Sequence, residues 1–201
     1  MKKLFAVFGL ALNQLFSLDL HGIEIMTGWE NLQSGAVSIS WCTYDDFPIS
    51  RAETVLNHSI DKISMAIQDL DHYPDIFDRV TKTNRLGTDV VQIVLDMPFP
   101  FDGRDYIVKY NIENLVDRWV FVFTAVAHPE GILDPDHVRL PNAAGIWILT
   151  ALEPNKTKVI YAWNGELLGN FPDFGLTRAW VTQGNEVLNW LNETLLNKGN
   201  S

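Results

Sequence analysis

Histidines and carboxylates are numerous enough in this chain to suggest metal binding or acid-base chemistry, with 5 His and 25 Asp+Glu. Their spacing supports neither. His128 and His137 flank an irregular segment that contains Asp134 and Asp136, which favours a solvated acidic loop over a divalent-cation site. Asp71-His72 resembles a catalytic dyad, but Asp before His-Tyr-Pro is more typical of a helix end and turn. With no Gly-x-Ser-x-Gly motif either, we predict no catalytic residue, no metal site and no cofactor.

Charge and composition narrow the function classes further. The 15 Lys+Arg against 25 Asp+Glu give a net charge of −10, which repels a phosphate backbone and excludes a general nucleic-acid binder. The single cysteine, Cys42, allows no intramolecular disulfide. A chain of 201 residues with 47% hydrophobic and 20% charged residues is expected to fold as one domain with a sizeable core.

The N-terminus predicts export. Met1-Lys2-Lys3 precedes the apolar run Leu4–Leu12, which is the pattern of a secretory signal peptide and is too short to span a bilayer comfortably. We expect a signal peptide over residues 1–17, with cleavage after Ser17, and a single domain over residues 18–201 in the periplasm or secreted. The alternative is an ordinary N-terminal helix of the folded domain.

Hydrophobic periodicity sets the order of the elements. Alternation predicts two strands, Gly35–Tyr44 and Ile49–Leu56, and the period then changes to that of a capped helix from about Ser59 to before Pro74. From Arg79 to Trp163 the chain is almost entirely strand signal, with short Asn, Gly, Pro and Asp turns that favour antiparallel hairpins. A last helix begins near Pro172 and reaches about Asn197, interrupted mildly by Gly184.

This order predicts an α+β fold, in which a curved antiparallel β-sheet wraps around a long C-terminal helix. A long helix that covers a wide curved sheet leaves space beneath it, so a ligand cavity is a natural product of this geometry. The ten residues from His128 to His137 form the longest irregular segment and are a candidate gate, with the C-terminal helix as a second one.

The sequence resembles the bacterial branch of the steroidogenic-acute-regulatory-related lipid-transfer (START) domains, within the helix-grip superfamily. The resemblance covers about Gly28 to Leu196 and is carried by six short motifs in family-like order, namely Asp69-Leu-Asp-His-Tyr-Pro74, Gly103-Arg-Asp-Tyr106, His137-Val-Arg-Leu140, Gly145-Ile-Trp147, Lys156-Thr-Lys-Val-Ile-Tyr161 and Gly169-Asn-Phe-Pro172. It implies that the protein encloses one lipid or sterol-like molecule. Members of the family often keep an ionisable pair in the cavity, whereas the comparable strand Val90–Leu95 offers Gln92 among apolar residues.

Strand and helix parity then predict the residues that contact a ligand. Arg139 is the candidate for a head group because a guanidinium matches phosphate or carboxylate oxygens, whereas Arg104 is expected to pair with a carboxylate across the sheet. Arg104 and Asp105 should point to opposite faces because they are adjacent on one strand. The predicted ligand-binding residues are Val91, Ile93, Leu95, Val108, Tyr110, Phe121, Phe123, Arg139, Leu140, Trp147, Tyr161, Trp180, Val187 and Leu191.

We therefore expect a non-enzymatic protein, monomeric, that binds and transfers a hydrophobic molecule or lipid with transient membrane contact. Two alternatives stay open. One is a small cyclase- or hydrolase-like enzyme of the same superfamily, with a carboxylate or tyrosine in the cavity as acid or base. The other is a structural interaction domain with a solid core and no cavity.

Overall fold

The structure is a computed structural model that describes residues 18–197, so the predicted signal peptide over residues 1–17 lies outside the described part. Ten strands form one sheet in the order β1-β2-β3-β10-β9-β7-β6-β5-β4, with β8 paired to β6 beside this path. The strands are β1 (Glu30–Gln33), β2 (Ser38–Tyr44), β3 (Phe47–Leu56), β4 (Val80–Arg85), β5 (Val90–Leu95), β6 (Gly103–Leu115), β7 (Arg118–Ala125), β8 (His137–Arg139), β9 (Ala144–Glu153) and β10 (Lys156–Asn164).

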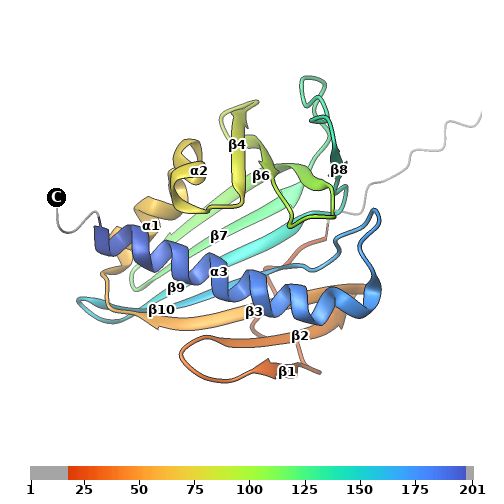
Figure 1. Cartoon of the computed structure of the whole chain (residues 1–201). Helices are drawn as coiled ribbons and strands as arrows, with labels where there is room; N and C mark the ends of the chain where they lie inside the picture. Colours follow the sequence, from red (N-terminus) through yellow and green to blue (C-terminus); the bar gives the residue numbers. More distant parts are fainter. Residues whose placement is uncertain (1–17, 198–201) are drawn as a thin grey trace, which may run out of the picture.

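The helices cover one face of this sheet. Figure 1 shows α3 (Leu176–Asn197) crossing the sheet, with α1 (Ile60–Gln68) and α2 (Tyr73–Ile76) beside its C-terminal half. A short 3-10 turn (Leu70–His72) joins α1 to α2, and another (Asp173–Gly175) leads into α3. This is the predicted helix-grip arrangement, and Ser59 caps α1 as expected, since its side chain accepts a hydrogen bond from the Lys62 backbone N–H.

Two elements differ from the sequence-based prediction. The short edge strand β1 was not predicted, because four residues give too short a pattern to detect. His137–Arg139 was expected to join the antiparallel strand that follows it, but as β8 it pairs in parallel with the start of β6. The loop before it turns the chain back along the sheet, so the pairing direction depends on contacts remote in sequence.

Alternation along the strands divides the apolar residues between two cores. Phe121 and Phe123 of β7 face inward, toward the helices, while Val120 and Val122 face outward. The outward core is closed by the segment before β1, which buries Leu18, Leu20 and Ile23 against the sheet, with Met26 and Trp29 packed around them. Both faces of the sheet are therefore partly covered, although the sequence indicated one.

Helix α3 is continuous, and Gly184 lies in close contact with the sheet. A Cβ on Gly184 would lie 3.0 Å from Ala52 Cβ and 3.0 Å from Ile39 Cδ1, which is tighter than ordinary packing. The glycine thus permits close contact between α3 and the β2–β3 side of the sheet, where the sequence suggested only a mild interruption. Among residues 18–197, no helix has both the length and the apolar character needed to cross a bilayer.

Candidate functional site

A cavity of about 940 Å³ lies between the inner face of the sheet and α3. Its floor is formed by strands β5, β6, β7, β9 and β10, and its roof by one face of α3 from Arg178 to Trp190. Most of the lining side chains are aromatic or aliphatic, which is the usual character of a small-molecule site of this size. The molecule therefore lacks the solid core that the interaction-domain alternative predicts.

Two loops form the rim of the cavity. Residues 97–101 between β5 and β6 and residues 165–175 between β10 and α3 both contribute lining side chains. They touch through Phe101 and Phe171, whose ring centroids are 4.6 Å apart. Phe99 is 97% exposed and Phe174 is 91% exposed, so each loop also presents a large apolar side chain to solvent.

The buried side chain of Arg104 links these two loops through hydrogen bonds. Its guanidinium is fully buried and donates hydrogen bonds to the carbonyl oxygens of Leu167, Leu168 (3.1 Å), Asp102 (2.5 Å) and Gly103 (3.1 Å). Burial lowers the pKa of Arg104, and the nearby Asp102 opposes that shift. The expectation of a carboxylate partner across the sheet is wrong, because backbone carbonyls satisfy this cation.

An ion pair spans the gap between α3 and the β4 side of the cavity. Arg79 donates to Glu186 through Nε (2.6 Å) and Nη2 (2.7 Å) in a bidentate arrangement, and both side chains line the cavity. About a quarter of each side chain is exposed, at 28% and 25%, so solvent weakens the attraction without removing it.

Seven of the fourteen predicted ligand-binding residues line the cavity, and the parity of their strands is as predicted. The seven are Leu95, Tyr110, Phe123, Leu140, Trp147, Tyr161 and Val187.

The other six apolar residues are buried elsewhere in the inner core. Val91, Ile93, Val108 and Phe121 belong to the cluster that packs around α1 and α2, whose side chains fill that part of the inner face. Trp180 packs on Trp41 with a centroid separation of 5.1 Å and donates to the Gly165 carbonyl oxygen, and Leu191 is buried in the same core. The sequence placed these residues on the correct face but could not show how far along it α1 and α2 extend.

Arg139 lies on the outer face of the sheet, not in the cavity. It forms an ion pair with the fully buried Asp105 and donates to the Gly131 carbonyl oxygen at 3.1 Å. Gln92, the polar residue of β5, also points outward and donates to Asp105 at 2.6 Å. The opposite orientations predicted for Arg104 and Asp105 are confirmed, and the head-group role predicted for Arg139 is not supported by its position.

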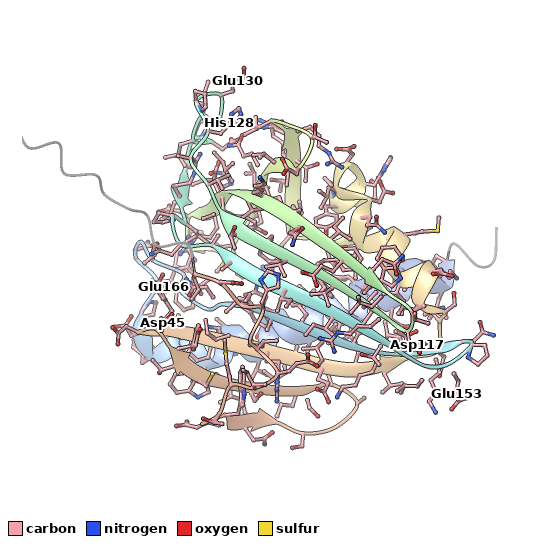
Figure 2. All side chains as sticks on the ribbon, turned by 180° about the vertical axis from the view of Figure 1, so that it is seen from behind. Asp45, Asp117, His128, Glu130, Glu153 and Glu166 are labelled. Carbon is pink, nitrogen blue, oxygen red and sulfur yellow. The ribbon has the colours of Figure 1, made fainter. Side chains whose placement is uncertain are left out.

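The same polar cluster holds the loop from His128 to His137 against the outer face. Gln92 donates to the Ile132 carbonyl oxygen at 2.7 Å, and a Cβ on Gly131 would collide with Ile107 at 1.9 Å. Figure 2 shows His128 and Glu130 at the tip of this loop, beyond the sheet. The loop lines no part of the cavity, so the prediction that it acts as a gate is wrong.

Several lining residues were not predicted. Tyr73 and Phe77 come from the turn around α2, and Phe101, Phe171 and Phe174 come from the rim loops. Irregular segments have no periodicity from which the facing direction could be read. Trp163 could have been included among the predicted residues from strand parity, because it lies two residues after Tyr161 on β10 and shares its face.

The tyrosines of the cavity are neutral hydrogen-bonding groups. Tyr110 is hydrogen bonded to Tyr73, and the Tyr73 hydroxyl donates to the Ile67 carbonyl oxygen at 2.7 Å. Burial raises the pKa of Tyr73, Tyr106, Tyr110 and Tyr161, so all four stay protonated at neutral pH. Within residues 18–197 there is no group of three or more His, Cys, Asp or Glu side chains placed to hold a metal ion.

No family model matches the sequence, and no curated protein matches it. Solved structures do match. A STAR-related lipid transfer protein from Xanthomonas axonopodis is 18% identical, with 84% of this chain and 99% of that chain covered and a TM-score of 0.71. Human StAR-related lipid transfer protein 5 is 17% identical over 86% of this chain and 88% of that one, with a TM-score of 0.73. The Zhui aromatase/cyclase from Streptomyces sp. R1128 is more distant, at 13% identity, coverage of 73% and 92%, and a TM-score of 0.52.

These likenesses agree with the geometry. The chain has the helix-grip fold of the START domains, as predicted, and its structural neighbours include a bacterial lipid-transfer domain.

Proposed function

We propose that this protein binds one hydrophobic molecule, of lipid or sterol-like size, in the cavity beneath α3 and transfers it between membranes without changing it chemically. The main support for the proposal is the cavity of about 940 Å³ with a mostly aromatic and aliphatic lining. Burying apolar ligand surface there is favourable at about 25 cal/mol per Å², so affinity needs few polar contacts. The lipid-transfer domains among the structural neighbours support the same class.

Ligand exchange in this proposal proceeds through the rim loops and α3. The contact between Phe101 and Phe171 and the Arg79–Glu186 pair both cross the boundary between the sheet side and the α3 side of the cavity. A molecule can enter when these contacts separate, a motion expected in microseconds to milliseconds.

The same rim supplies the membrane contact that transfer requires. Phe99 and Phe174 are almost fully exposed at the mouth of an apolar cavity, where insertion into a bilayer surface would cover them. Because the chain carries a net charge of −10, this contact depends on apolar side chains and not on attraction to anionic lipids. Export of a monomer by the predicted signal peptide completes the proposal.

A non-enzymatic role is favoured over the cyclase- or hydrolase-like alternative by the state of the ionisable groups in the cavity. Of the two carboxylates that line it, Glu186 pairs with Arg79 and Glu166 accepts hydrogen bonds from Asn142 and Asn164. The raised pKa values keep the buried tyrosines protonated, so they do not accept a proton at neutral pH. The aromatase/cyclase among the neighbours shares the fold, and a fold alone does not determine the reaction.

Native mass spectrometry of the purified chain, followed by solvent extraction, tests the proposal. We expect one hydrophobic molecule per chain, recovered unmodified. Ala179→Trp would fill the cavity from α3 and should abolish co-purification, whereas Thr177→Trp, on the exposed side of the same helix, should not. An empty wild-type chain that also takes up no fluorescent fatty acid would refute the proposal, and a chemically altered ligand would favour the enzyme.

A further inference from the structure

Four aromatic rings form a continuous stack along one wall of the cavity. Trp147 and Tyr161 have ring centroids 4.2 Å apart at an interplanar angle of 27°, and Tyr161 and Trp163 are 4.8 Å apart at 19°. Phe77 extends the stack from Trp147, at 6.3 Å and 28°. All four rings line the cavity.

Strand pairing builds this stack and fixes its position. Trp147 on β9 is the direct partner of Tyr161 on β10, and Trp163 follows Tyr161 on the same face of the same strand. Phe77 is held by an edge contact with Tyr73, with centroids 4.9 Å apart at 83°. The stack is therefore anchored to the middle of the sheet and to the end of α2, and not to the rim loops.

Stacking determines which part of each ring a ligand meets. Tyr161 is stacked between Trp147 and Trp163, and Trp147 has Tyr161 against one face and the more distant Phe77 beside it, so mainly the ring edges of Tyr161 and Trp147 are left for a ligand. An aromatic edge carries partial positive charge and is attracted to the π face or to a carbonyl oxygen of a conjugated molecule. A row of such edges is complementary to a flat conjugated molecule laid across it.

Trp163 forms the end of the row. It is 5% exposed, and its indole Nε1 has almost no accessible surface, so a molecule in the cavity meets the ring of Trp163 and not its N–H group. Of the three arginines that line the cavity, Arg104 is engaged by four carbonyls, Arg79 pairs with Glu186, and Arg178 is exposed to solvent. This arrangement favours an uncharged ligand.

We infer that the preferred ligand is a planar, conjugated, uncharged molecule that lies across the edges of Phe77, Trp147, Tyr161 and Trp163. This inference rests on the proposed function and names the class of molecule within it. A flexible saturated chain would fill the same volume but gain nothing from the row of ring edges.

Calorimetric titration with two uncharged probes separates this inference from the general one. Anthraquinone is planar, conjugated and carries carbonyl oxygens, whereas hexadecanol is flexible and saturated. We expect both to bind the full-length purified protein, anthraquinone about tenfold more tightly, since aromatic pairs contribute beyond the area they bury. The achiral anthraquinone should also acquire an induced circular dichroism band, because the asymmetric stack holds it in one orientation.

Variants test whether the aromatic stack causes the preference for anthraquinone over hexadecanol. Trp147→Leu should reduce the affinity for anthraquinone about tenfold and change that for hexadecanol less than about twofold. Trp119→Leu is the matched control, because Trp119 stacks on Phe121 at 5.7 Å and 9° but does not line the cavity. Trp163→Phe keeps a ring at the end of the stack, so it should change the affinity for anthraquinone less than Trp147→Leu does.

The outcomes are distinct. Equal affinity of the wild type for the two probes would overturn this inference and leave the proposed function standing, and that comparison needs no variant to fold. Failure of both probes to bind would overturn the proposed function and the inference with it. An unchanged anthraquinone affinity in Trp147→Leu would also reject the stack as the recognition element.

Discussion

At the residue scale, the neighbours Arg104 and Asp105 show how one step along a strand separates two environments. Arg104 points inward and joins the two rim loops, whereas Asp105 points outward and holds Gln92 and Arg139. Both are fully buried charges, and each is satisfied by hydrogen bonds on its own face. Neither is free to act as a charged anchor for a ligand.

The assignment of Asp105 to stability can be tested directly. Asp105→Ala should lower the free energy of unfolding by roughly 3 kcal/mol, because it leaves Arg139 and Gln92 without their buried partner. Urea denaturation measures this change. The affinity of the folded variant for a hydrophobic probe should stay within about twofold of that of the wild type. A large loss of affinity would instead indicate that Arg139 contributes to ligand binding.

His58 should make stability depend on pH. Burial, with a contribution from Lys62, holds the pKa of His58 below its ordinary value of 6.5. The unfolded chain therefore binds more protons as the pH falls below about 6.5, so the stabilisation present at higher pH is lost on acidification. Comparing urea midpoints at neutral and mildly acidic pH should show a smaller loss in His58→Gln than in the wild type, and an equal loss would contradict this role.

At the element scale, the order of most elements along the chain, the parity of the long strands and the long helix could be predicted from the sequence, because periods of two and of three to four residues are local properties. Phe121, Trp147 and Tyr161 were accordingly placed on the correct face. Six apolar residues predicted to bind the ligand lie outside the cavity because its extent depends on where α1 and α2 end and how the rim loops fold. Those are non-local contacts between irregular segments, and no periodic pattern encodes them.

The segment before β1 is an element whose importance only the structure reveals. Ile23→Ala should lower the free energy of unfolding by about 3 kcal/mol, because Ile23 is fully buried in the outward core. Ile25→Ala is the matched control in the same segment. Ile25 is 85% exposed, and its loss should change stability by less than about 0.5 kcal/mol in the same denaturation experiment.

At the scale of the whole molecule, the sheet and α3 are joined across the cavity by a small number of contacts. Glu186→Gln removes the charge that Arg79 pairs with, and should weaken the closed state by about 0.5–1 kcal/mol. Release of a fluorescent fatty acid, followed by stopped-flow mixing with acceptor vesicles, should become roughly two- to fivefold faster.

A control for this prediction lies at the opposite end of the molecule. Glu153→Gln removes the partner of Lys156 (3.2 Å) in the turn between β9 and β10, which Figure 2 shows far from Glu166 at the rim. This variant should release the fatty acid at the wild-type rate. If both variants or neither accelerate release, the Arg79–Glu186 pair does not control opening.

The distribution of tryptophans gives the molecule an optical property of its own. Three of the seven, Trp147, Trp163 and Trp190, line the cavity, while Trp29, Trp41, Trp119 and Trp180 do not. A bound ligand that absorbs near-ultraviolet light would contact the first group of tryptophans and would lie farther from the second. It should therefore quench the fluorescence of the first group more strongly. The intrinsic tryptophan fluorescence of the protein should then report binding and release of such a ligand without an attached dye.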